Sequence, residues 1–179
     1  CFPKDVKALI NTGIEYGYPM RILQSVDEVN EYQKAILVGK INSHFKQSVR
    51  GKTLAVWGLS FKPKTDDMRE APSRVLIEAL LEAGAKVHTH DPEAMQVAGG
   101  IYGERGSFRT YENPYEAANG ADALVMVTEW KLYWVPDFER LAKEMKQKIL
   151  LDARNVWSQE SALNHGFTLY AIGRPTVSK

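Results

Sequence analysis

Three basic side chains, those of Lys62, Lys64 and Arg69, lie within one loop-like stretch that runs from Gly58 to Ala71. The stretch follows a short apolar run and leads into a helical pattern, where anionic groups are often bound in α/β proteins. Ser60 stands where the second glycine of a G-x-G-x-x-G fingerprint would be, so the pattern does not indicate a close backbone approach to a pyrophosphate. We therefore expect side chains to hold an anionic group here. A solvated basic loop is the alternative.

A further cation, Arg154, follows the apolar run 149–151. If the apolar runs are parallel strands, Arg154 and Lys62 lie at the same edge of the sheet, where ligands bind in such folds. Two cations that converge at this edge would neutralise a diphosphate. The alternative is that Arg154 pairs with Asp152 or Glu129.

The single cysteine of the chain is its first residue, and a helical pattern follows it directly. A helix N-terminus and the nearby Lys4 lower the pKa of a thiol, which favours a nucleophilic thiolate. Asp5 lies one helical turn away, near enough to handle a water molecule or a proton. Cys1 is therefore a candidate nucleophile; an inert thiol and a processed N-terminal nucleophile are the alternatives.

His88, His90 and Asp91 resemble a set of metal ligands, but the pattern has a simpler explanation. Residues two apart share one face of a strand, and an Asp-Pro step is ordinary turn chemistry. We expect no metal site here. Asp91 follows the second predicted strand, a position from which a nucleotide ribose is often contacted.

Short apolar runs alternate with helical patterns from Lys52 onward. We expect strands at 53–57, 86–90, 108–111, 123–127, 149–151 and 167–171, and helices at 72–83, 113–120 and 136–145. This alternation predicts an α/β fold with a Rossmann-like, doubly wound parallel sheet over residues 52 to about 175.

Two helical patterns precede the sheet. The first begins at the amino end and stops at Gly17. Ser25 and Glu28 form a capping-box pattern at the start of the second, which would close at Gly51. At 1.5 Å per residue this helix would be about 35 Å long, which indicates a connecting or dimerisation helix.

The composition is that of a soluble globular protein, with 179 residues, 44% hydrophobic and 25% charged. The net charge is +1, from 23 basic and 22 acidic residues, so we expect no nucleic-acid partner. No apolar run has the length of a membrane span, and we expect no membrane partner. One cysteine excludes an internal disulfide framework, and we expect a cytoplasmic protein.

Five segments resemble, in order, motifs of the UDP-glucose/GDP-mannose dehydrogenase family. Cys1–Asp5 resembles its catalytic-cysteine motif, Val29–Lys34 its central-helix signature and Gly58–Glu70 its UDP-binding loop. His90–Pro92 and Asp152–Asn155 also recur at similar spacing. The Phe-Pro pair after the cysteine favours the UDP-glucose branch of the family.

The resemblance implies a catalytic-cysteine segment with a central dimerisation helix over residues 1–51, and a UDP-sugar-binding, Rossmann-like domain over 52–179. It implies a homodimer formed through that helix. NAD is the implied cofactor, bound mainly by an N-terminal domain that we expect this chain to lack. The chain would then be a fragment that is inactive alone, with Cys1 at the point where it was cut.

The implied reaction oxidises the C6 alcohol of UDP-glucose to a carboxylate with two NAD, through a thiohemiacetal and a thioester on the cysteine. The resemblance implies catalytic roles for Cys1 and Asp5, substrate binding by Phe61, Lys62 and Arg154, and NAD contacts from Lys4 and Arg69. Alternatives are a family member acting on GDP-mannose or a UDP-N-acetyl sugar, and a non-catalytic nucleotide-binding or dimerisation module. An N-terminal-nucleophile hydrolase would need a different layered fold.

Overall fold

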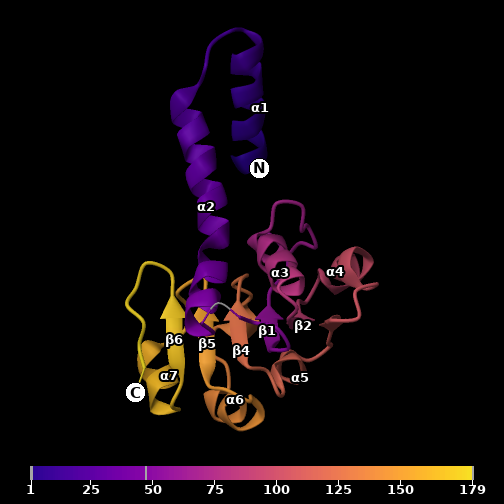
Figure 1. Cartoon of the computed structure of the whole chain (residues 1–179), viewed down its shortest axis with the longest axis vertical. Helices are drawn as coiled ribbons and strands as arrows, with labels where there is room; N and C mark the ends of the chain where they lie inside the picture. Colours follow the sequence, from indigo (N-terminus) through magenta and orange to yellow (C-terminus); the bar gives the residue numbers. More distant parts are fainter. Residues whose placement is uncertain (1, 47, 179) are drawn as a thin grey trace. The chain divides into compact units, whose positions relative to one another are not determined.

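The computed structural model describes residues 2–46 and 48–178; Cys1, Gln47 and Lys179 lie outside the described residues. The chain forms two compact units, one ending at Ile36 and one beginning at Leu37. Figure 1 shows the helices of the first and the sheet of the second. No helix among the described residues is both long and apolar enough to cross a membrane.

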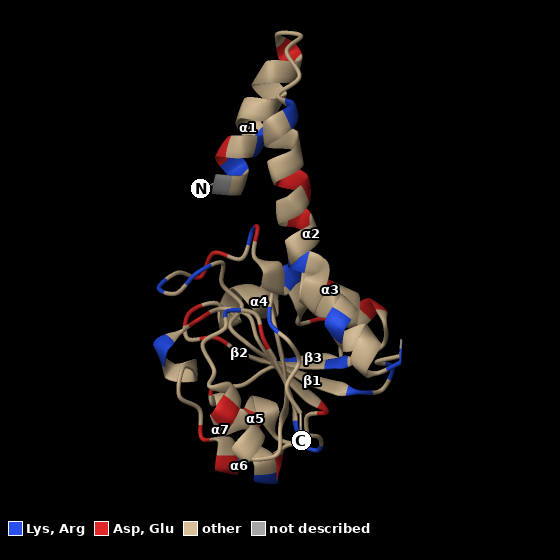
Figure 2. Ribbon diagram, turned by 90° about the vertical axis from the view of Figure 1, so that its left-hand side faces the viewer, with Lys and Arg blue, Asp and Glu red and all other residues tan. Residues whose placement is uncertain are grey.

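The first unit is a helical hairpin of α1 (Phe2–Glu15) and the first part of α2 (Arg21–His44), which lie side by side in Figure 1. Gly17 turns the chain between them with a φ of 69°. Glu31 of α2 accepts from Lys7 of α1 across the hairpin at 3.3 Å, and from Lys34 of its own helix at 2.9 Å. Figure 2 shows acidic and basic residues on both helices.

The bounds predicted for the long helix were wrong at both ends. The helix starts at Arg21, so Ser25 lies inside it and caps nothing. Pro19 accounts for the start, because its ring prevents an earlier helical turn from continuing through it. At the other end the helix stops at His44, and Lys46 takes a φ of 51°, which breaks the helical path before Gly51 is reached.

The second unit contains a six-stranded sheet in which every neighbouring pair of strands is parallel, in the order β3-β2-β1-β4-β5-β6. The strands are β1 (Thr53–Trp57), β2 (Lys86–His90), β3 (Phe108–Thr110), β4 (Ala123–Met126), β5 (Ile149–Asp152) and β6 (Thr168–Ala171). The predicted parallel, doubly wound Rossmann-like sheet is confirmed.

Helices cover both faces of this sheet. Along β1, Leu54 and Val56 pack with the end of α2, α3 and α4, whereas Ala55 and Trp57 pack with α5, α6 and α7. These helices are α3 (Pro72–Glu82), α4 (Met95–Tyr102), α5 (Pro114–Ala118), α6 (Phe138–Glu144) and α7 (Gln159–Asn164), with a 3₁₀ turn η1 (Lys131–Tyr133). Because both faces are buried, the central strands β1 and β4 are mostly apolar.

Sequence reasoning missed α4, α7 and η1. α4 contains Gly99 and Gly100, which lower the helical propensity of the segment. Its burial of Ala98 and Tyr102 against the core explains why it is helical nevertheless.

Gly58 lies where the loops that leave β1 and β4 come close together. It has a φ of +88°, and a Cβ built there would lie 2.5 Å from the backbone nitrogen of Thr128. Its N–H donates to the carbonyl of His90 at 2.9 Å. A side chain at this position would therefore force neighbouring backbone apart.

We expect Gly58→Ala to lower the free energy of unfolding by at least about 2 kcal/mol, through the positive φ and the backbone clash. Urea denaturation of the chain would measure it. The control is Gly99→Ala on α4, where a Cβ meets no heavy atom within 4 Å and stability should stay level or rise slightly. Equal effects of the two substitutions would contradict this account.

Candidate functional site

The buried carboxylate of Asp91 joins three loops at the carboxyl edge of the sheet. Its Oδ2 accepts from the backbone N–H of Leu59 at 2.6 Å, from that of Ser60 at 3.1 Å, and from the indole of Trp130 at 3.1 Å. Its Oδ1 accepts two further backbone N–H groups at 2.9 Å from the turn that follows it. Asp91 is 0% exposed, and both of its oxygens are engaged with the protein itself.

The loop between β1 and α3 closes on itself beyond this anchor. The N–H of Phe61 donates to the carbonyl of Asp67 at 2.8 Å, and the hydroxyl of Ser60 donates to the carbonyl of Lys62 at 3.0 Å. Lys62 and Lys64 are exposed, and their ammonium groups form no ion pair within residues 2–46 and 48–178. The loop therefore presents Lys62 as a free cation beside the half-buried ring of Phe61.

Arg69 already has an anionic partner in the same loop. Its Nε and Nη2 donate to the two carboxylate oxygens of Asp67 at 3.0 and 2.8 Å. The side-chain hydrogen bonds from Arg69, followed by the one from its backbone, lower the pKa of Asp67 to about 2. This bidentate pair holds Arg69, an expected contact of NAD, against the surface of its own loop.

Arg154 is held by groups that end β4. Its Nε donates to the carbonyl of Val127 at 2.8 Å and lies 2.9 Å from the Oε2 of Glu129. Because the hydrogen on Nε points to Val127, the contact with Glu129 is one of charge rather than a hydrogen bond. Neither terminal nitrogen of Arg154 has a hydrogen-bond partner in the described part of the chain, so both remain available to an anion.

Asp152, the last residue of β5, sets the backbone path that leads to Arg154. Its Oδ1 accepts the N–H of Arg154 at 2.8 Å and that of Asn155 at 2.7 Å, and its Oδ2 accepts the N–H of Trp157 at 2.8 Å. The sequence offered two acids as partners of Arg154. The side chain of Arg154 pairs with Glu129, whereas Asp152 accepts backbone N–H groups. Sequence reasoning missed this role, although an acid at the end of a strand just before a turn was a usable signal.

One more hydrogen bond connects the lysine loop to the arginine. The hydroxyl of Thr128 donates to the carbonyl of Ser60 at 2.5 Å, and the adjacent Val127 carbonyl holds Arg154. The structure therefore brings the loops of Lys62 and Arg154 together at one edge of the sheet, as the sequence predicted. The convergence of the two cationic groups on one anion stays a prediction.

Lys4 and Asp5 belong to the helical unit, which is described by itself. Their charged groups lie 4.0 Å apart at the start of α1, and both side chains are largely exposed. Cys1, the expected nucleophile, lies outside the described residues.

The two histidines of β2 have separate surroundings. The Nδ1 of His90 lies 2.6 Å from the hydroxyl of Tyr133 in the core, and burial lowers the pKa of His90. Burial also raises the pKa of Tyr133 far above its ordinary value. His88 contacts the ring of Tyr111 instead. Among the described residues, no group of three or more His, Cys, Asp or Glu side chains is placed to hold a metal ion.

Comparison with known proteins decides the family. Residues 55–159, which include the loops just described, match the UDP binding domain of the UDP-glucose/GDP-mannose dehydrogenase family. The chain belongs to this family. The resemblance inferred from five motifs is thereby confirmed.

Family members resemble the chain along almost all of its length. It is 44% identical to a UDP-glucose 6-dehydrogenase of Pseudomonas aeruginosa over 98% of this chain and 39% of that protein, and 41% identical to one of Rhizobium meliloti over the same shares. The chain thus spans about two fifths of the length of these relatives.

Solved structures of family members have the same fold. A UDP-glucose dehydrogenase of Pyrobaculum islandicum superposes with a TM-score of 0.76 at 35% identity, covering 87% of this chain and 34% of that one. A GDP-mannose dehydrogenase of Pseudomonas aeruginosa superposes with a TM-score of 0.68 at 25% identity, covering 96% and 38%.

We expect Asp91→Asn to lower the free energy of unfolding by about 2–4 kcal/mol. The NH₂ group of the new asparagine would face buried N–H donors, and these donors would lose their acceptor. Urea denaturation would measure the change. The control is Asp66→Asn, an exposed carboxylate in the loop between β1 and α3, and it should be neutral. An Asp91→Asn chain as stable as the unmodified one would refute the anchoring role.

We expect Arg69→Ala to raise the pKa of Asp67 from about 2 part of the way to its ordinary value, since the backbone donor remains. A folded-state pKa below the unfolded one stabilises the fold above the unfolded pKa, and this stabilisation disappears as the pH falls through the folded pKa. In the Arg69→Ala variant, the free energy of unfolding should therefore depend less on pH in the acidic range. Carboxyl ¹³C shifts followed against pH would measure it; Lys64→Ala is the control and should leave Asp67 unchanged.

Proposed function

We propose that this chain is the catalytic-cysteine and UDP-sugar-binding part of an NAD-dependent UDP-glucose 6-dehydrogenase, which oxidises UDP-glucose to UDP-glucuronate. The observation that carries the proposal is the match to the family's UDP binding domain over residues 55–159. The names of the curated relatives support UDP-glucose as the substrate. A cytoplasmic location is part of the proposal.

The carboxyl edge of the sheet would hold the nucleotide. The ammonium of Lys62 and the free terminal nitrogens of Arg154 are suited to the two phosphates, because charge-assisted hydrogen bonds from two sides balance a diphosphate. The half-buried ring of Phe61 offers an apolar surface next to the lysine. The buried anchors Asp91 and Asp152 would keep these groups in place before the ligand arrives.

Cys1 and Asp5 would carry the chemistry at C6. In the proposed path the thiolate of Cys1 adds to the C6 aldehyde to give a thiohemiacetal, and loss of a hydride from C6 leaves a thioester. Water then attacks the thioester, the acid is released and the thiolate is restored. Asp5 would assist the water or the thiol proton. The exposure of Asp5 on α1 leaves its carboxylate accessible for this role.

The sheet of this chain does not suit a dinucleotide at its first crossover. The loop after β1 folds back through the Phe61–Asp67 hydrogen bond, and Ser60 stands where a G-x-G-x-x-G fingerprint has its second glycine. We therefore assign NAD, the hydride acceptor, mainly to the part of the relatives that this chain does not match. Lys4 and Arg69 are the residues here that we propose to contact it.

Two alternative functions are compatible with the same site. The likeness to a GDP-mannose dehydrogenase favours a different nucleotide sugar, and relatives acting on UDP-N-acetylated sugars share the fold. A non-catalytic nucleotide-binding module is the second alternative, and the two-fifths coverage favours it for the chain by itself.

The variants Lys62→Ala and Cys1→Ala separate binding from chemistry. Calorimetry with UDP should show weak binding to the chain, weakened further by about tenfold in Lys62→Ala and unchanged in Cys1→Ala. In the full-length enzyme carrying this chain, Cys1→Ala should abolish UDP-glucuronate formation from UDP-glucose and NAD.

Near-normal acid formation by the full-length Cys1→Ala enzyme would rule out the thiol as nucleophile. Production of NADH by the 179-residue chain alone would contradict the assignment of NAD binding. Turnover of GDP-mannose or a UDP-N-acetyl sugar in preference to UDP-glucose would overturn the proposed substrate.

We also propose that the chain forms a homodimer through α1 and α2. Eight of the twelve large hydrophobic side chains described as exposed belong to the helical unit. They are Leu9, Ile14, Tyr16, Tyr18, Ile22, Val26, Val29 and Tyr32. Those at 22, 26 and 29 follow helical spacing and form one stripe on α2.

We expect Val29→Asp to shift the chain from dimer to monomer, because a carboxylate would be buried in an apolar interface. Sedimentation equilibrium at tens of micromolar would measure the mass. Ile101→Asp is the matched control, since Ile101 is an exposed apolar residue on α4. A monomeric mass for the unmodified chain would count against the dimer.

A further inference from the structure

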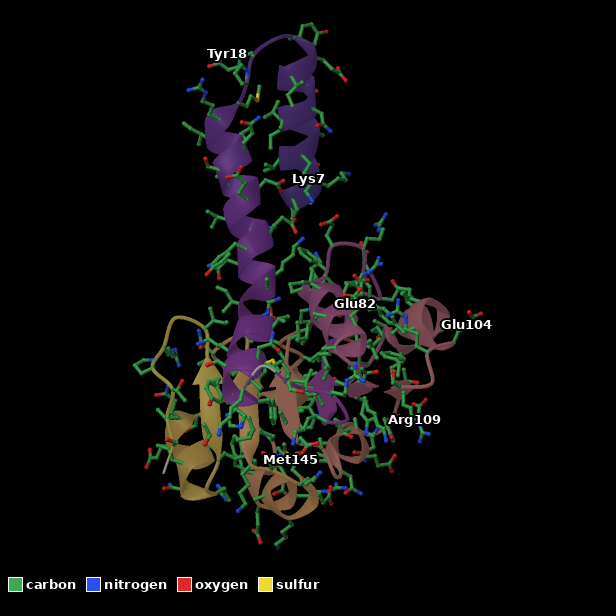
Figure 3. The ribbon with its side chains drawn as sticks, in the orientation of Figure 1. Lys7, Tyr18, Glu82, Glu104, Arg109 and Met145 are labelled. Carbon is green, nitrogen blue, oxygen red and sulfur yellow. The ribbon has the colours of Figure 1, made fainter. Side chains whose placement is uncertain are left out.

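A second basic site lies at the other end of the strands, where β1 and β2 begin. A pocket of about 290 Å³ opens there, lined by Thr53, Lys86, His88, Gly106, Ser107 and Arg109. It shares no residue with the carboxyl-edge site. Figure 3 labels Arg109, which belongs to the edge strand β3.

Strand register brings the basic side chains together. His88 pairs with Arg109 across β2 and β3, and Lys86 pairs with Thr53 across β2 and β1. Lys86 and His88 are two apart on β2 and so point to the same face, and a residue paired across parallel strands shares that face. Two cations and an imidazole from neighbouring strands therefore line one hollow.

These cations are not neutralised within the part of the chain that the structure describes. Neither Lys86 nor Arg109 forms a side-chain ion pair there. The acid that contacts the backbone of Thr53 is Asp122, whose Oδ1 already lies 3.7 Å from Lys52 and 3.5 Å from Lys146. An uncompensated basic hollow attracts anions.

His88 adds an independent feature. Its Nδ1 is buried and has no hydrogen-bond partner among the described residues. Burial, then the charge of Arg109, lower the pKa of His88. Buried polar atoms without partners are few in folded proteins, and a missing ligand is one physical reason for them.

We propose that this pocket binds a small dianion, namely phosphate or the phosphate group of a monoester, between Lys86, Arg109 and His88. The two cations would supply charge-assisted hydrogen bonds, and the hydroxyl of Ser107 would supply a neutral one. The volume leaves room for a small group attached to the phosphate. Since the pocket is separate from the carboxyl edge, the proposal does not depend on the proposed function.

Titration of the chain with inorganic phosphate at constant ionic strength, followed by NMR, tests the proposal. Phosphate should shift the ring signals of His88 and the backbone amides of Ser107 and Arg109 along a saturable curve, whereas chloride should not. The double variant Lys86→Ala/Arg109→Ala should weaken phosphate binding at least about tenfold, because it removes both charged donors.

The matched control is Lys131→Ala/Arg174→Ala, which removes two exposed cations from other parts of the chain. It should leave phosphate binding unchanged, and UDP binding should survive the Lys86→Ala/Arg109→Ala substitutions. Glycerol 1-phosphate in place of inorganic phosphate would show whether the pocket takes an ester. Shifts that do not saturate, or that persist equally in both double variants, would overturn the proposal.

Discussion

The carboxylate of Asp91 is the group on which the arrangement of the carboxyl edge depends. A buried charge is costly unless donors surround it, and here backbone and indole N–H groups from three loops point at its two oxygens. The same hydrogen bonds that stabilise the charge hold the start of the lysine loop and the Trp130 side chain. Removing the carboxylate would leave those donors buried without an acceptor, so the loops and the charge stabilise one another.

A similar relation positions the arginine. Asp152 orders the turn after β5 by accepting three backbone N–H groups, and the Val127 carbonyl takes the Nε of Arg154. The guanidinium is thereby held at one nitrogen and open at the other two. This geometry suits the proposed diphosphate, because a preorganised donor loses little conformational entropy when the anion binds.

Some charged side chains of the chain are paired with an opposite charge and others are not. For anion binding, this difference matters more than the net charge of +1. Arg69 is paired with Asp67, and Glu31 is shared by two lysines in the helical hairpin. Lys62, Lys86 and Arg109 form no ion pair in the described ranges. Unpaired basic groups therefore lie at both ends of the strands, at the proposed nucleotide site and at the proposed phosphate site.

The sequence was sufficient to predict the sheet and the edge where the site lies. Apolar runs buried on both faces are a local signal, and the predicted bounds of β1 and β2 agree with the structure to the residue. The cations at strand ends follow from the same reading, since parallel strands share one carboxyl edge. The motifs around these residues were also enough to predict the family.

Only the tertiary structure decided the partners of those residues. Arg154 had two acids within reach in the sequence, and the ends of β4 and β5 determine that its side chain meets Glu129 while Asp152 binds backbone. The helix α4 likewise depends on burial against the sheet more than on its own propensity. Spacing along a chain determines which face or edge a residue occupies, whereas hydrogen bonds and ion pairs depend on distances between loops that only folding brings together.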